Sequence, residues 1–390
     1  MHPAQKIKGS KSDLLLNKKI ILGITGSIAA EETVKLAREL IRFGADVQAV
    51  MSEEAKKIIT VESLKFATGK EVIDYISGNV EHVDLLEHAD LLLIAPCSAN
   101  TISKIANGIA DSTVSLFGTT ALGSVKIMIA PAMHDKMFKN PVIEDNVNTL
   151  EHYGVMFIPP KIEENKAKMA DYETIVAYAV RALNDDYKNK KVLVIGGGSV
   201  EPIDDVRTIS NLSTGTTALE LAKNAFYLGA EVTLFIGANS VLIPTYIKTE
   251  HFDSVNSLIE NIPQMLDYDY IFVPAALSDF TVKKRAGKIT SDKPLNLELE
   301  PTPKFIEKLR TQYKNALVGF KAEYDIPDDQ LLKKGQEKLK EYHLEFMIAN
   351  DLKKVEKEHT ELLFISPSTH KKLAGSKAEI TLQILKLILR

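Results

Sequence analysis

The sequence of 390 residues contains a single cysteine, Cys97, and no tryptophan. One cysteine cannot form an intramolecular disulfide, which favours a reducing compartment. No apolar run approaches the length of a membrane span, and the run at 14–16 is too short for a signal peptide. These absences predict a cytoplasmic protein without a membrane partner.

An excess of charge of one sign is also absent. The 48 Lys and Arg residues and the 52 Asp and Glu residues give a net charge of −4. Without a global positive field, the chain is not expected to bind nucleic acid. Hydrophobic residues make up 45% of the sequence, and a chain of this length can bury two separate cores. We therefore expect two domains.

Short apolar runs alternate with helical patterns along the chain. The runs are rich in Val, Ile and Leu rather than alternating, which is typical of strands buried on both faces. The pattern predicts two α/β domains, each a Rossmann-like or flavodoxin-like three-layer fold with a parallel sheet. The polar stretch 184–191 predicts the boundary between domains 1–186 and 187–390. Strands are expected at 20–24, 46–51, 91–95, 125–130, 155–158, 192–195, 232–236, 270–273, 316–320 and 346–349, and helices at 28–43, 101–109, 172–183, 216–228, 254–266, 303–313 and 328–342.

The segment EPIDDVRTISNLSTG, at 201–215, is the most informative part of the chain. It follows a predicted strand and the glycine triplet 196–198, and it ends where a helical pattern begins. An arginine, an amide and several hydroxyl groups therefore gather near a helix N-terminus, which favours a bound phosphate or carboxylate. An ordinary strand-to-helix loop with Ser and Thr caps is the alternative interpretation.

Two segments of the first half suggest a nucleotide site. GITGSIAA, at 23–30, is a strand–turn–helix pattern that lacks the third glycine of a dinucleotide fingerprint, and the second strand ends at Ser52 rather than at an acidic residue. A mononucleotide therefore fits better than NAD. APCSANTISKIANGIADS, at 95–112, places small donors at the carboxyl end of a strand, where open α/β sheets bind ligands. Plain helix capping is the alternative for these donors.

The motifs GSIAA, HVDL, PCSANTISKIANGIAD and PAM occur in this order, and over about 18–183 the chain resembles the flavin-dependent cysteine decarboxylases. In that chemistry a flavin oxidises the substrate thiol to a thioaldehyde, the neighbouring carbon loses CO2, and the reduced flavin returns the hydride. The resemblance implies His82 as the catalytic base. It also implies FMN held by Gly26, Ser27, Ser52, Ser98, Asn100 and Thr101.

Two features depart from the family's pattern. His134 stands in PAMH where the family has an asparagine that contacts the substrate carboxylate; a protonated imidazole can make this contact in a pH-dependent way. The family's cysteine-containing loop corresponds to 159–171, which has no cysteine. Either another group protonates the enethiol, or this half forms the intermediate poorly, or it is not a decarboxylase. Cys97 is expected to be a small buried residue rather than a replacement acid.

The second half resembles phosphopantothenate–cysteine ligases through five motifs in the family's order: 201–215, AALSDF at 275–280, GKI at 287–289, VGFKAE at 318–323 and AND at 349–351. A carboxylate must be activated before it reacts with an amine, and forming an acyl-nucleotide needs a site that neutralises a triphosphate. Together the halves resemble the bifunctional enzymes of coenzyme A synthesis, of archaeal type. That resemblance implies ligation of cysteine to 4′-phosphopantothenate with CTP or ATP and Mg2+, followed by FMN-dependent decarboxylation to 4′-phosphopantetheine.

Site residues of the second half follow from this resemblance. Lys288 lies in the basic segment 283–293, which is expected to be flexible and to close over the phosphates, although a solvated charged loop is the alternative. Lys288 and Asn211 are expected to be catalytic, and Asp279 to bind Mg2+. Tyr342 stands where the family often has a second lysine. The nucleotide is expected to contact Ala275, Asp279, Lys288, Phe320, Lys321 and Lys338, and the substrate Arg207, Asn211 and Ala276.

Two other interpretations stay open. One is a working ligase fused to a flavoprotein half whose decarboxylase activity is lost or altered. The other is an NAD-linked oxidoreductase with two Rossmann-like halves. The resemblance further implies a homo-oligomer, a trimer or a trimer of dimers, whose partners are small-molecule substrates.

Overall fold

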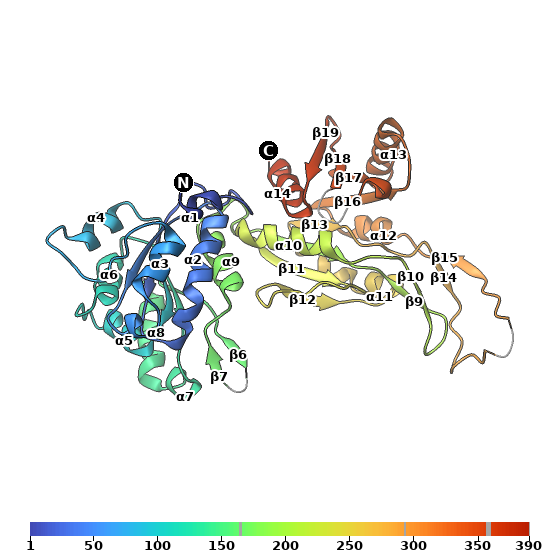
Figure 1. Ribbon diagram of the computed structural model, residues 1–390. Coiled ribbons are helices and arrows are strands. Elements are labelled where there is room, and N and C mark those ends of the chain that lie inside the picture. The colour runs from blue at the N-terminus through green and yellow to red at the C-terminus, as the bar shows by residue number, and fades with distance from the viewer. Residues whose placement is uncertain (164–165, 292–293, 356–359, 390) are drawn as a thin grey trace. The chain divides into compact units, whose positions relative to one another are not determined.

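The computed structural model describes residues 1–163, 166–291, 294–355 and 360–389. The chain divides into two compact units, Met1–Asn184 and Asp185–Arg390, close to the predicted boundary after residue 186 (Figure 1). Each unit has its own parallel sheet. Residues 164–165 of the predicted cysteine-free loop and 292–293 of the predicted basic segment lie outside the described residues.

The first unit is built on a five-stranded sheet with the order β2-β1-β3-β4-β5 and parallel pairing throughout. Every residue of β3 is buried, as expected for a central strand covered on both faces. The five predicted strands are confirmed, and an additional antiparallel pair, β6 and β7, forms within the predicted loop 159–171. The strands are β1 (Lys19–Ile24), β2 (Asp46–Met51), β3 (Leu91–Cys97), β4 (Ile127–Pro131), β5 (Met156–Phe157), β6 (Lys161–Glu163) and β7 (Lys166–Lys168).

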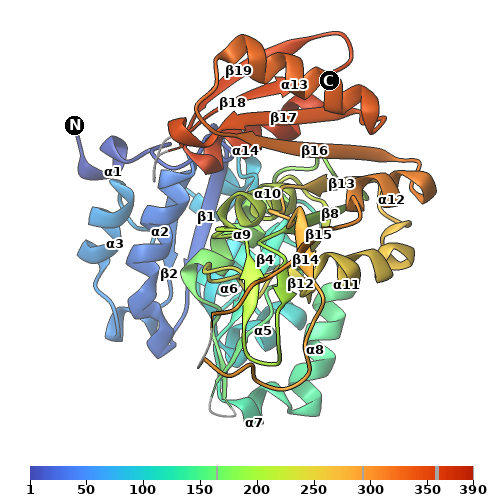
Figure 2. The ribbon, with the colours of Figure 1, turned by 90° about the vertical axis from the view of Figure 1, so that its right-hand side faces the viewer.

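Helices α1, α2 and α3 of this unit lie side by side (Figure 2). The helix expected at 28–43 begins as a 3-10 turn, η1, before α2 buries Leu36 and Leu40 on its inner face. The helix expected at 101–109 begins earlier, because the Ser98 side chain caps α5. The helices are α1 (Pro3–Lys6), η1 (Ile28–Glu32), α2 (Thr33–Arg42), η2 (Ala55–Lys57), α3 (Val61–Thr68), α4 (Glu81–Glu87), α5 (Ala99–Ala106), α6 (Thr113–Ala121), α7 (Asp135–Phe138), α8 (Pro141–His152) and α9 (Tyr172–Ala182).

The second unit has an eight-stranded sheet with the order β12-β11-β8-β13-β16-β17-β18-β19. Pairing is parallel from β12 to β17, and β18 and β19 are antiparallel. The strand order reverses at β8, so a ligand is expected beyond the carboxyl ends of β8 and β13. The strands of the sheet are β8 (Lys191–Gly196), β11 (Glu231–Ile236), β12 (Lys248–His251), β13 (Tyr270–Val273), β16 (Ala316–Glu323), β17 (Phe346–Asp351), β18 (Thr360–Ile365) and β19 (His370–Gly375).

Two hairpins, β9 (Val200–Pro202) with β10 (Thr208–Ser210) and β14 (Phe280–Val282) with β15 (Leu299–Pro301), follow β8 and β13 (Figure 1). The predicted helix 254–266 is wrong as one element. It is α11 followed by the 3-10 helix η3, because Pro263 lacks the N–H that a continuing helix needs. The helices are α10 (Thr216–Tyr227), α11 (Val255–Glu260), η3 (Ile262–Met265), α12 (Phe305–Gln312), α13 (Asp328–Glu341), η4 (Leu352–Lys354) and α14 (Lys377–Ile388).

The glycine triplet after β8 has a packing reason. A Cβ at Gly196 would lie 2.0 Å from the Cβ of Ala218, so α10 approaches this strand too closely for any side chain. Gly197 has a φ of +75°, which side chains rarely adopt. The triplet therefore lets the chain turn tightly from β8 into the segment 201–215.

Candidate functional sites

In the first unit, a cavity of about 310 Å³ opens beyond the carboxyl ends of β2, β1, β3 and β4. It combines small polar groups with the apolar side chains of Ala132, Met133 and Met137. All six residues predicted to hold a flavin nucleotide line it. The lining consists of Gly26, Ser27, Ser52, Glu54, Ser98, Ala99, Asn100, Thr101, Lys104, Ser112, Ala132, Met133 and Met137.

Hydrogen bonds fix the polar wall of this cavity. The Ser98 N–H donates to Oγ1 of Thr25 at 3.0 Å, and the Thr25 hydroxyl donates to the Pro96 carbonyl at 2.9 Å, which ties the ends of β1 and β3 together. Ser98 Oγ accepts the Thr101 N–H at 3.4 Å. Helix capping, the alternative interpretation of Ser98, is therefore real, and it coexists with a place on the cavity wall.

Three polar residues of the cavity wall were missed at the sequence level: Glu54, Lys104 and Ser112. Lys104 also forms an ion pair of 2.8 Å with Asp111. Its position was readable from the sequence, since Lys104 follows Asn100 and Thr101 by four and three residues on the same helix face. Ser112 lies beyond the end of α5, so no helical period connects it to the cavity.

His82, the predicted base, does not line this cavity of its own chain. It lies in the first turn of α4, and its ring is 6.4 Å from that of Phe117 in an edge-on arrangement. Its Nδ1 atom is buried and has no hydrogen-bond partner among the described residues. Three exposed apolar side chains lie near this histidine in the sequence: Tyr75, Val80 and Val83.

His134 caps the short helix α7, where its Nδ1 accepts the Lys136 N–H at 3.3 Å. Its neighbours Met133 and Met137 line the cavity, but His134 does not. In the cysteine-free segment, β6 pairs with β7, and β7 contacts α7. The two departures from the family's pattern therefore lie beside each other at one side of the cavity.

Cys97 is fully buried at the end of β3, and burial raises the pKa of its thiol far above the ordinary value. A thiol held in this way is a poor nucleophile. We expect Cys97→Ala to leave CO2 release within about twofold of the wild type, since no reacting group is removed. A thiol reagent is expected to modify the native protein only after denaturant is added. Rapid labelling of the native chain, or loss of CO2 release in the variant, would contradict this assignment.

In the second unit, the predicted ligase motifs at 201–215 and 275–280 meet beyond the carboxyl ends of β8 and β13. Ser199 links the two strand ends, since its hydroxyl donates to Ser278 Oγ at 3.0 Å and accepts the Ser278 N–H at 2.9 Å. The Asn211 amide donates to the Leu277 carbonyl at 3.0 Å. The Ala276 N–H donates to the Gly197 carbonyl at 2.8 Å. Asn211, Ala275 and Ala276 therefore lie within one hydrogen-bonded corner of the sheet.

Hydrogen bonds attach the described part of the predicted basic segment around Lys288 next to this corner. Arg207 Nη1 donates to the Ile289 carbonyl at 3.0 Å and to Asp204 Oδ2 at 2.8 Å. The N–H of Ile289, and then those of Val206 and Arg207, lower the pKa of the Asp204 carboxyl to about 2 against the opposing effect of its burial. The structure thus brings Arg207 and the GKI motif together, and the side chain of Lys288 is exposed.

Asp279, the predicted magnesium ligand, follows β13 and forms an ion pair of 2.5 Å with Lys304 at the start of α12. Its side chain is largely exposed. No group of three or more His, Cys, Asp or Glu residues able to hold a metal ion occurs in the described ranges. A cation at Asp279 would therefore need further oxygen ligands, such as those of a triphosphate.

Phe320 and Lys321 lie near the end of β16. Glu323 bridges Lys321 and Lys334 at 3.1 Å and 2.9 Å, so Lys334, which was not predicted as a site residue, lies with Lys321. Lys338 follows Lys334 by one turn of α13. Its ammonium pairs with Glu341 at 2.8 Å and lies 4.9 Å from the centre of the Tyr342 ring. The structure thus gives Lys338 two local partners and does not join it to the corner around Asn211.

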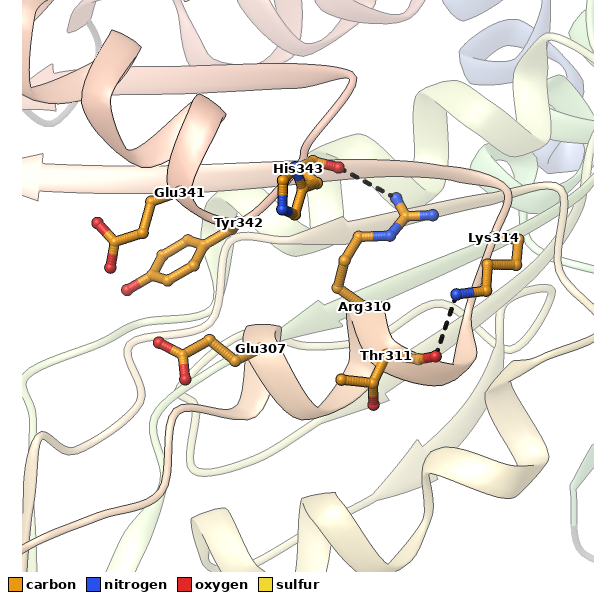
Figure 3. A pocket seen from close by; sticks show the side chains of 7 residues that line it. All are labelled: Glu307, Arg310, Thr311, Lys314, Glu341, Tyr342 and His343. Carbon is orange, nitrogen blue, oxygen red and sulfur yellow. Dashed lines mark hydrogen bonds between the residues drawn. The ribbon is translucent and has the colours of Figure 1, made fainter.

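A larger cavity, of about 460 Å³, lies between α12 and the end of α13 (Figure 3). Arg310 donates there to the His343 carbonyl, and Lys314 donates to the Thr311 carbonyl at 3.1 Å. The side chains of Arg310 and Lys314 therefore bind backbone carbonyls at the C-terminal ends of α13 and α12, which is a structural role. None of the predicted site residues lines this cavity, which is formed by Glu307, Arg310, Thr311, Lys314, Glu341, Tyr342 and His343.

Among the described residues, none of the helices combines the length and apolar character needed to cross a bilayer.

Two family models match the chain. The Flavoprotein family matches 8–184, and the C-terminal domain of the DNA/pantothenate metabolism flavoproteins matches 187–390.

Curated relatives match along nearly the whole chain. The coenzyme A biosynthesis bifunctional protein CoaBC of Thermococcus kodakarensis is 44% identical and covers 96% of this chain and 95% of its own. That of Methanocaldococcus jannaschii is 41% identical and covers 100% of this chain and 97% of its own. A crystal structure of the DNA/pantothenate metabolism flavoprotein from Streptococcus pneumoniae is 26% identical, covers 51% of this chain and 98% of its own, and has a TM-score of 0.47. The chain therefore belongs to the family of bifunctional proteins of coenzyme A biosynthesis, and its first unit is a flavoprotein domain.

Proposed function

We propose that the chain joins cysteine to 4′-phosphopantothenate in its second unit and decarboxylates the product to 4′-phosphopantetheine in its first unit. One observation carries this proposal: the six predicted flavin residues line one cavity at the carboxyl edge of the first sheet, and at that edge of the second sheet Arg207 contacts the GKI motif and Asn211 contacts the AALSDF motif. A flavoprotein with a lost decarboxylase activity, and an NAD-linked oxidoreductase, are less well supported, because the relatives of the whole chain are bifunctional proteins of coenzyme A biosynthesis.

FMN is the flavin proposed for the first unit. The donors on the cavity wall, Ser27, Ser52, Ser98, Asn100 and Thr101, are small and suit a phosphate and a ribityl chain, and Ala132, Met133 and Met137 offer an apolar surface for a ring. When bound, FMN supplies the two-electron chemistry that converts a thiol to a thiocarbonyl, next to which a carboxylate is lost readily. The chain's own residues bind, orient and shield the substrate there.

Flavin retention tests this cavity. Asn100→Ala is expected to weaken FMN binding about three- to tenfold, because one hydrogen bond of this kind contributes about 1 kcal/mol. Asn100 is exposed and lines the cavity, so its loss should not disturb folding. The quenching of FMN fluorescence during titration measures the affinity.

Asn107→Ala is the matched control for Asn100→Ala, because Asn107 ends the same helix without lining the cavity. Equal affinities for the Asn100 and Asn107 variants would place the flavin elsewhere.

In the second unit, Lys288 is proposed to neutralise the triphosphate while the carboxylate of 4′-phosphopantothenate attacks the α-phosphorus and pyrophosphate leaves. Arg207 would hold a phosphate or carboxylate of the substrate, which suits a guanidinium, and its ion pair with Asp204 keeps it in position. The Asn211 amide donates to the Leu277 carbonyl, and this side chain is proposed to bind an acyl or pantothenate oxygen as well. Cysteine nitrogen then displaces the nucleotide from the acyl group.

The nucleotide and the metal are tested together. We propose that CTP or ATP brings Mg2+ with its phosphates and that Asp279 supplies a protein oxygen once Lys304 is displaced. Pyrophosphate release from CTP and from ATP, each with and without Mg2+, identifies the co-substrate. Release from neither nucleotide in the presence of both substrates would refute the ligase assignment.

A homo-oligomer in the cytoplasm is also proposed, as a trimer or a trimer of dimers. His82 lies outside the cavity of its own chain, and the exposed apolar residues Tyr75, Val80 and Val83 lie near it in the sequence. Covering this surface with a second copy would bury those side chains. Sedimentation of the purified chain measures the stoichiometry.

A further inference from the structure

The consecutive carboxylates Asp204 and Asp205 bracket Lys288. Asp205 Oδ2 accepts the N–H of Gly287 at 2.7 Å, and Asp204 Oδ2 accepts the N–H of Ile289 at 3.0 Å. The two backbone N–H groups on either side of this lysine are thus held by one short segment, 204–205, that lies about 80 residues away in the chain. The lysine side chain between them remains exposed.

Further bonds support this bracket. The Asp205 N–H donates to the Gly287 carbonyl at 3.3 Å, and the Arg285 N–H donates to the Ile203 carbonyl at 2.9 Å. Lys284 forms an ion pair of 2.7 Å with Asp205. These bonds therefore attach the segment 284–289 to residues 203–205, which connect β9 to β10.

The Asp204 side chain is fully buried, and both of its oxygens are used. Oδ1 accepts the N–H groups of Val206 and Arg207 at 2.8 Å and 2.6 Å, which closes a local turn. Oδ2 accepts Arg207 Nη1 at 2.8 Å in addition to Ile289. One oxygen therefore shapes the turn, and the other joins Arg207 to the loop that carries Lys288.

We propose that Asp204 and Asp205 are positioning residues that hold Lys288 in place for the phosphates of the nucleotide. The proposal rests on the role of Lys288 under the proposed ligase function. Without these bonds, the exposed loop would have to be ordered each time Lys288 binds its ligand, and this costs conformational entropy. Preorganised cations act more strongly than cations that must first be ordered, and a displacement of about 1 Å can cost about 100-fold in rate.

Two substitutions separate the parts of this bracket. Asp204→Asn keeps one acceptor for the local turn but places an N–H2 group opposite Ile289 or Arg207. Asp205→Asn weakens the bonds to Gly287 and Lys284 and does not touch Arg207. Asp269→Asn is the matched control, because Asp269 also accepts a backbone N–H, that of Lys191 at 2.8 Å, at the opposite end of the sheet.

Trypsin cleavage after Arg285 and Lys288 reports the order of the loop independently of activity, since cleavage of folded protein requires local opening. We expect cleavage at these bonds to be about tenfold faster in both Asp204→Asn and Asp205→Asn than in Asp269→Asn. In the ligation assay, kcat should fall about 10- to 100-fold in both. KM for 4′-phosphopantothenate should rise only in Asp204→Asn, because only that variant releases Arg207.

The outcomes are distinguishable. Cleavage at the wild-type rate in both variants overturns the bracket itself. If the Asp204 and Asp205 variants are cleaved faster but keep the wild-type kcat, while Lys288→Ala loses activity, the positioning role is overturned. If Lys288→Ala also keeps the wild-type kcat, the proposed role of Lys288 itself has failed. If Asp204→Asn does not fold, Asp205→Asn decides alone, because its side chain is 52% exposed and its loss leaves the buried turn intact.

Discussion

Lys288→Ala is expected to slow pyrophosphate release by about 100- to 1,000-fold, because a preorganised cation that stabilises developing charge contributes on this scale. The effect should fall mainly on kcat. Flavin content should stay at the wild-type level, since Lys288 belongs to the second unit and the flavin cavity to the first. Initial rates of pyrophosphate release at saturating substrates, together with the absorbance of bound flavin, provide the measurement.

Lys283→Ala is the matched control, since Lys283 is an exposed lysine of the same basic segment and lies outside the bracket around Lys288. A small effect in this control and a large one in Lys288→Ala would separate a specific contact from general loss of positive charge. Equal small effects in both variants would show that the segment is a solvated charged loop.

His82→Ala is expected to reduce CO2 release by about 100- to 10,000-fold, the range of general acid–base catalysis, without affecting ligation. The buried Nδ1 atom of His82 lacks a partner among the described residues, and a polar atom in this state is costly unless it serves a ligand or a second copy. Release of labelled CO2 from added 4′-phosphopantothenoylcysteine measures this effect independently of the ligation reaction.

His88→Ala controls for the helix, because His88 is exposed and ends the same helix α4. It should retain full activity. Should His82→Ala lose both CO2 release and pyrophosphate release, the histidine would be needed for folding rather than for catalysis, and the assignment would fail.

Most parallel strands of both sheets were predictable because strands buried on both faces leave continuous apolar runs, such as those of β3 and β13. Strands β12 and β19 have no such run and were not predicted. The helices α3, α4, α6 and α8 were not predicted. Helices α4 and α8 each have one buried residue, Leu86 and Leu150, so neither has an apolar stripe that a sequence pattern could reveal. The break at Pro263 was visible in the sequence and should have ended the helix expected at 254–266.

The candidate sites were predictable to different degrees. The flavin cavity follows from motifs that lie directly after strands, so local sequence order placed its residues together. The attachment of the loop around Lys288 was not predictable, because its partners Asp204 and Asp205 are far away in the chain and a run of basic residues suggests a solvated loop. Lys334 could have been found, since it shares a helix face with Lys338 at a spacing of four residues.

The most direct test supplies the purified chain with FMN, 4′-phosphopantothenate, cysteine, Mg2+ and either CTP or ATP, and follows pyrophosphate and CO2 in one reaction. We expect both products, with CO2 appearing after pyrophosphate and approaching equal amounts. Pyrophosphate without CO2 would contradict the decarboxylase assignment of the first unit, and the absence of both products would contradict the bifunctional assignment as a whole.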